Sequence, residues 1–171
     1  MSKSEKKIQD SFLELLKIYP IEDISVIMLC DKLKMKRQTF YYHYPSIYDL
    51  IFSIFYEMKI ESNKNSDFKK IIEDLEAFLK NNDYLCKAIL DTFASSILEE
   101  FVSSYYYRSL KGLYDYKKKL CDINFIKFIS KGLNEITISL YKENNFNYKN
   151  LCSIFKRFTK EFSFIDECLV K

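Results

Sequence analysis

Apolar residues recur every three or four positions along almost the whole chain, a spacing that places them on one face of a helix. The first such stretch covers residues 8–19, and a proline follows it directly. Ser25 is suited to cap a second helix of about two turns, which breaks near residues 34–35. A third short helix is expected over residues 36–44, before another proline. The pattern predicts two short helices joined by a tight turn inside a three-helix head.

A capping pattern at Ser46 opens a longer helix that closes this head. Residues 61–67 are the most linker-like stretch of the chain. Gly112 and the lysines at 117–119 together indicate a turn near the end of a long helix expected from residue 92 to 113. Further helical stretches are expected at residues 68–79, 85–89, 92–113, 126–140 and 151–169. We therefore expect an all-α protein with a head of residues 1–60 and a helical body of residues 61–171.

The last two expected helices carry apolar residues on more than one face. Phe125 and Phe128 lie off the main stripe of the first, and Phe164 lies off that of the second. Such surface favours a homodimer in which a partner subunit covers it. The alternative is a deeply buried core within one subunit.

Composition narrows the class of protein. Apolar residues make up 48% of the chain, which supports a packed core, while two glycines and two prolines favour helices over turn-rich sheets. No apolar run reaches the length of a membrane span, and the charged first residues precede no apolar signal core. The five cysteines form no CxxC pair, and there is one histidine, so neither a metal site nor a cofactor is expected. These features predict a cytoplasmic protein with no membrane contact.

The third short helix carries most of the candidate chemistry. Arg37 can fork onto guanine, Gln38 can pair with adenine, and Thr or Tyr hydroxyls can reach phosphates or base edges. Phe40 and Tyr44 fall at helical spacing and can face the core of the head. Four cations in six residues, from Lys32 to Arg37, add positive charge, although the net charge of the chain is only +3. A binding surface for DNA is indicated, with a merely solvated face as the alternative.

Residues 24–50, ISVIMLCDKLKMKRQTFYYHYPSIYDL, closely resemble the DNA-binding head of the TetR/AcrR family of bacterial regulators. The likeness is strongest over RQTFYYHY and the following YDL, and the wording RQTFYYH is most similar to regulators of dihydroxyacetone kinase operons. The resemblance implies a helix-turn-helix DNA-binding domain over residues 1–60 and a ligand-binding and dimerisation domain over residues 61–171. It implies base contacts from the start of the third helix and phosphate contacts around it. The implied DNA-binding residues are Ser25, Lys34, Lys36, Arg37, Gln38, Thr39, Tyr41, Tyr42 and His43.

Three positions depart from the family pattern. Lys34 stands where a glycine is usual in the turn, so the backbone there is either left-handed, at a cost on the order of 1 kcal/mol, or differently shaped. Lys36 replaces a small hydroxyl residue, and Ile47 replaces a lysine that opens the fourth helix. The new lysines compensate the charge lost at Ile47.

The resulting expectation is a ligand-responsive homodimeric repressor that binds a near-palindromic operator in double-stranded DNA. The alternative is a protein-interaction co-regulator on the same fold with weakened DNA binding. An enzyme is not expected, because the single histidine has no nucleophile motif beside it. In the body, Tyr106 and Arg108 are candidates to line an inducer pocket, with Arg108 meeting an anionic group. The run of three tyrosines before Arg108 must point in three directions, which instead favours helix packing.

Overall fold

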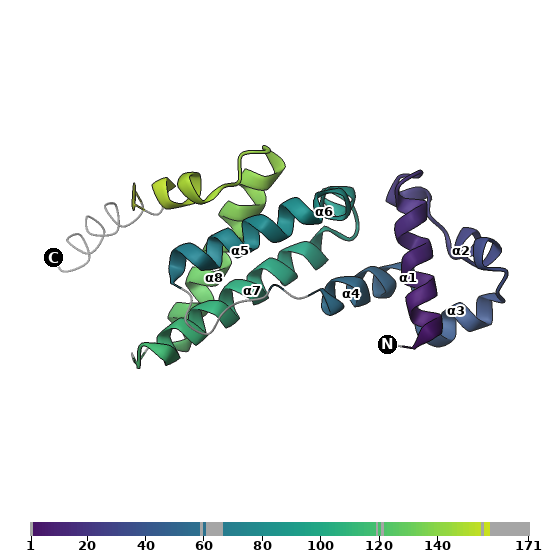
Figure 1. The fold of residues 1–171 in the computed structure, drawn as a ribbon, viewed down its shortest axis with the longest axis horizontal. Coiled ribbons are helices and arrows are strands. Elements are labelled where there is room, and N and C mark those ends of the chain that lie inside the picture. The colour runs from purple at the N-terminus through teal and green to yellow at the C-terminus, as the bar shows by residue number, and fades with distance from the viewer. Residues whose placement is uncertain are drawn as a thin grey trace. The chain divides into compact units, whose positions relative to one another are not determined.

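The computed structural model describes residues 2–58, 60, 67–118, 120, 122–154 and 156–157. Within these ranges all regular secondary structure is helical, which confirms the predicted all-α class (Figure 1). The elements are α1 (Lys3–Leu16), η1 (Ile21–Asp23), α2 (Val26–Leu33), α3 (Arg37–His43), α4 (Ile47–Glu57), α5 (Phe68–Asn81), α6 (Asp83–Ile89), α7 (Ser95–Tyr116) and α8 (Ile123–Lys142).

Two of the expected features of the body concern where its helices end. A turn does follow the long helix, at Lys117 and Lys118 as the lysines indicate, but α7 continues through Gly112 to Tyr116. Glycine is only modestly unfavourable inside a helix, and neighbouring packing overrides that preference. Of the last expected helix, residues 148–154 are helical, while Phe164 lies outside the described residues.

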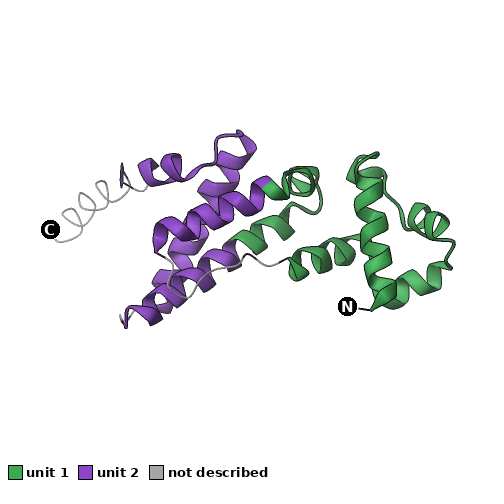
Figure 2. Ribbon diagram, in the orientation of Figure 1, with its two compact units in different colours: residues 1–59, 81–102 green, residues 60–80, 103–171 purple. Residues whose placement is uncertain are grey.

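The chain forms two compact units (Figure 2). The first comprises residues 1–59 and 81–102, and the second comprises residues 60–80 and 103–171. Helix α7 contributes its first turns to one unit and the remainder to the other. The first unit therefore joins the predicted head to residues 81–102, and the expected domain boundary near residue 60 stays a prediction.

The first unit is built around the apolar faces of its helices. Helix α1 packs on α2 and α6, and α2 packs on α3. Its fully buried side chains include Phe12, Leu29, Phe40, Leu50 and Ile51. A polar cluster lies beside them: the Gln9 side-chain amide is 3.4 Å from the Tyr44 hydroxyl and 3.1 Å from the Ser53 hydroxyl. This buried cluster fixes the end of α3 between α1 and α4.

The second unit has a core of α5, α7 and α8 side chains. The Tyr106 hydroxyl is hydrogen-bonded to the Thr137 hydroxyl at 2.8 Å, and both residues are fully buried. Tyr105 donates to the carbonyl oxygen of Ile71 at 2.8 Å. Both aromatic hydroxyls are thus satisfied inside an apolar core, as buried phenols require. These bonds tie α7 to α8 and to α5.

Candidate nucleic-acid interface

A tight turn joins α2 to α3. Lys34 has φ 50° and ψ 43°, the left-handed conformation that was one of the two alternatives for this residue. Its N–H donates to the Asp31 carbonyl at 3.2 Å, and the Met35 N–H donates to the Cys30 carbonyl at 2.9 Å. These are the two hydrogen bonds of a Schellman C-cap, a motif in which glycine is the usual left-handed residue. The turn therefore keeps the glycine geometry with a lysine in it.

Helix α3 presents one apolar face to the core and its polar face to solvent. Phe40 is fully buried, and Tyr44 is buried with its hydroxyl in the Gln9 cluster. Burial raises the pKa of the Tyr44 hydroxyl, so this group remains a neutral hydrogen-bonding partner. Tyr41 is 53% exposed and Tyr42 is 85% exposed. The predicted division of α3 into core-facing and outward residues is confirmed.

Seven of the residues predicted to contact DNA are exposed on the turn and on α3. They are Lys34, Lys36, Arg37, Gln38, Thr39, Tyr41 and Tyr42. Lys36 is the N-cap residue of α3, but its side chain makes no capping hydrogen bond. Because Phe40 is locked in the core, the exposed side chains of α3 project from a rigid base.

The charge around α3 is positive and largely uncompensated. No Asp or Glu occurs between Lys32 and Tyr48 in the sequence. Lys32 pairs with Glu14 of α1 at 3.0 Å, which neutralises one cation of the Lys32–Arg37 cluster. Among the described residues, no carboxylate pairs with Lys34, Lys36 or Arg37. These three cations are therefore available to an external anion.

Two other nominated residues have partners inside the protein. The Ser25 hydroxyl caps α2 by accepting the Met28 N–H at 3.3 Å, as predicted, and the side chain is half-buried. His43 is half-buried, with Nδ1 3.5 Å from a Glu5 carboxylate oxygen. The Ser2 backbone N–H and hydroxyl, together with His43, hold the pKa of Glu5 below its usual range. The phosphate contact expected of His43 would require this side chain to leave Glu5.

Sequence reasoning missed the residues that hold α3 and α4 in place. Gln9 and Ser53 flank Tyr44, and the Tyr48 hydroxyl lies 3.2 Å from the Ser96 hydroxyl at the start of α7. The partners are 35 to 48 residues apart, so no local pattern signals them. Ser46 did carry a local signal, and its hydroxyl accepts the Asp49 N–H at 3.2 Å as the capping pattern predicts.

The two inducer-pocket candidates are not brought together. Arg108 is exposed and lines a polar hollow between α7 and α8. Tyr106 is fully buried, and its hydroxyl is hydrogen-bonded to that of Thr137. It lines neither that hollow nor the apolar cavity of the same unit. The packing interpretation of the tyrosine run therefore holds for Tyr105 and Tyr106.

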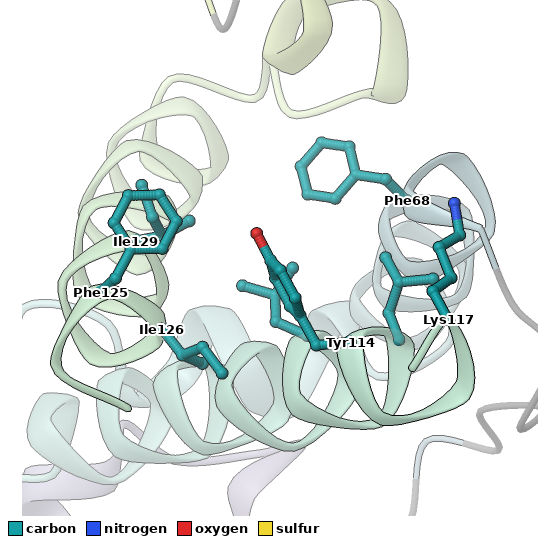
Figure 3. A pocket seen from close by; sticks show the side chains of 8 residues that line it. Phe68, Tyr114, Lys117, Phe125, Ile126 and Ile129 are labelled. Atoms are coloured by element: carbon teal, nitrogen blue, oxygen red, sulfur yellow. The ribbon is translucent and has the colours of Figure 1, made fainter. Parts of the chain in front are cut away.

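A separate apolar cavity of about 350 Å³ lies in the second unit among α5, α7 and α8 (Figure 3). Its walls are Phe68, Leu110, Leu113, Tyr114, Lys117, Phe125, Ile126 and Ile129. The Tyr114 ring points into the space between Phe68 and Ile129. A cavity of this size with mostly apolar walls and a few polar groups is typical of small-molecule sites. No local pattern in the sequence predicts this cavity, because it depends on how three helices cross.

Neither a protein-family model nor a curated protein matches this sequence. None of the described helices is long and apolar enough to cross a membrane. Within the same part of the chain, no three His, Cys, Asp or Glu side chains gather closely enough to hold a metal ion.

Proposed function

We propose that this protein is a sequence-specific, DNA-binding transcription regulator of the TetR/AcrR kind, with α3 as the helix that enters the major groove. The observation that carries this proposal is the exposed face of α3. It bears Arg37 and Gln38, whose side chains match base edges, beside Tyr41 and Tyr42, whose hydroxyls reach phosphates. Three uncompensated cations supply the electrostatic attraction. A solvated face of a helix has no need for this combination.

The proposed active form is a homodimer. Along α8, Phe125 and Phe128 lie three residues apart on one face and are each at least half exposed, which is a costly arrangement for a lone subunit. In the proposed dimer, a second copy covers this face, buries the two phenylalanines and brings two α3 helices to one duplex. Two-fold symmetry in the protein then requires a near-palindromic operator.

The proposed regulator responds to a small apolar ligand in the cavity beside Tyr114. Helix α7 provides walls of that cavity from Leu110 onward and carries Ser96, which contacts Tyr48 of α4. A ligand that shifts α7 would therefore act on the element that contacts the head. Such a shift changes the population of DNA-competent dimers, and repression relieved by the ligand is the simplest outcome.

The proposal is tested by binding of the purified full chain to the DNA upstream of its own gene, with excess random competitor. With Arg37 assigned to base edges, Lys34 and Lys36 from each of two subunits predict about four phosphate contacts. Affinity should then fall about a hundredfold between about 50 and 200 mM salt, and a complex should survive competitor at the lower salt. Equal affinity for upstream and random DNA would reject sequence-specific binding. The protein-interaction co-regulator would then be the better account.

A further inference from the structure

A second hollow in the same unit is chemically unlike the apolar cavity. It has a volume of about 500 Å³ and lies between α7 and α8. The residues that line it include Ser103, Ser104, Tyr107, Arg108, Lys127 and Lys131. On α8, Lys127 and Lys131 are one turn apart on a flank different from that of Phe125 and Ile129, which line the apolar cavity. The two sites therefore differ in both place and chemistry.

The hollow concentrates positive charge without compensation. Among the described residues, no carboxylate pairs with Arg108, Lys127 or Lys131, although Glu135 is one turn beyond Lys131 on the same helix. Other lysines of this unit do form such pairs. Like charges at i and i+4, as at Lys127 and Lys131, destabilise a helix. An anion in the hollow would relieve this repulsion.

The hydrogen-bonding groups of the hollow match a phosphate group. Arg108 presents a planar fork that fits two phosphate oxygens, and two lysines supply point charges from the facing helix. Ser103, Ser104 and Tyr107 add hydroxyl groups from α7. A carboxylate has two oxygens and one charge, so it would leave part of this set unused. The terminal phosphate of a small molecule has three oxygens and close to two charges.

We propose that this hollow is a binding site for a small, soluble, phosphate-bearing molecule. Its concave shape and its volume favour a small molecule over a nucleic-acid duplex, whose phosphates lie on convex ridges. The site itself does not depend on DNA binding. Helix α7 carries both Arg108 and Ser96, which contacts Tyr48 of α4. An effect of the bound anion on operator affinity through this helix would rest on the proposed function.

The test is calorimetric titration of the full chain with inorganic phosphate and with phenyl phosphate, without DNA. The titrations are run at pH 8, where a phosphate monoester is a dianion. Phenol serves as the uncharged counterpart of phenyl phosphate. The variants are Arg108→Gln and Lys127→Gln, with Lys149→Gln as the control, which removes one exposed charge of the same unit outside the hollow. Unchanged melting temperatures establish that the variants fold.

We expect phenyl phosphate to bind, phenol not to bind, and Arg108→Gln to weaken phenyl phosphate binding by about tenfold or more. Lys127→Gln should weaken it to a smaller extent, and Lys149→Gln should stay within about twofold of wild type. Absence of binding up to about 10 mM would overturn the proposal, as would equal losses in Arg108→Gln and Lys149→Gln. A parallel titration with random duplex DNA separates the sources of phosphate. If Arg108→Gln weakens duplex binding as much as phenyl phosphate binding, the hollow is a nucleic-acid surface and the proposal fails. None of these outcomes depends on whether α3 reads an operator.

Discussion

Replacing Lys34 by glycine should stabilise the protein, because the turn before α3 holds a lysine in a conformation that suits glycine. A side chain in the left-handed region costs about 1–2 kcal/mol, and Lys34 has φ 50°. Glycine removes that cost but gains conformational entropy in the unfolded chain, worth about 0.4–1 kcal/mol in the opposite direction. The expected net gain in the free energy of unfolding is about 0.5–1 kcal/mol, or about 1–4 °C in Tm for a chain of this size.

The assay is urea and thermal unfolding followed by far-ultraviolet circular dichroism. The matched control is Lys34→Ala, which removes the same charge but keeps the Cβ atom and its strain. Since Lys34 is exposed and forms no ion pair among the described residues, alanine should leave the stability close to wild type. Equal effects of glycine and alanine would refute the strain argument, as would a loss of stability in the glycine variant.

The remaining predictions concern the core of the second unit and the proposed dimer. Tyr106→Phe should lower the free energy of unfolding by about 1–2 kcal/mol, because it leaves the Thr137 hydroxyl unpaired. Adding Thr137→Val should recover part of this loss. If the losses of the two single variants simply add in the double variant, the pairing is contradicted. Burial raises the pKa of the hydroxyls of Tyr105 and Tyr106, so the unfolded chain loses these protons first. The free energy of unfolding should hold below about pH 10 and fall above it. The fall should be less steep in Tyr106→Phe. If thermal melts show the same pH dependence in wild type and in this variant, Tyr106 does not contribute to the fall. Phe128→Glu should convert a dimer to a monomer in sedimentation analysis, while an unaffected dimer would exclude this face of α8.

Local patterns predicted the elements around α3 well, because each signal and its structural consequence lie within one turn of helix. Ser25 caps α2 as its position before an apolar stretch predicts, and Phe40 faces the core at helical spacing. The turn after α7 lies at Lys117 and Lys118 and not at Gly112, because a single glycine only weakly opposes a helix that packing supports.

Long-range partners could not be predicted in this way. His43 contacts Glu5, which is 38 residues away in the sequence and comes close only when α1 and α3 meet in the folded first unit. The hydroxyl of Tyr106 finds Thr137 across 31 residues, which turns a pocket candidate into a core residue. The cations of the polar hollow, Arg108 and Lys131, likewise meet only through the crossing of α7 and α8.

Base reading by Arg37 is tested by comparing the variants Arg37→Ala and Lys17→Ala. Lys17 is an exposed cation at the end of α1. The measurement is the ratio of affinities for the upstream DNA and for random duplex, in the same buffer. The account predicts that Arg37→Ala weakens upstream binding by about 1–3 kcal/mol with little change on random DNA. Lys17→Ala should leave the ratio unchanged. A ratio that is the same in wild type and Arg37→Ala would contradict the claim that α3 reads DNA sequence through this residue.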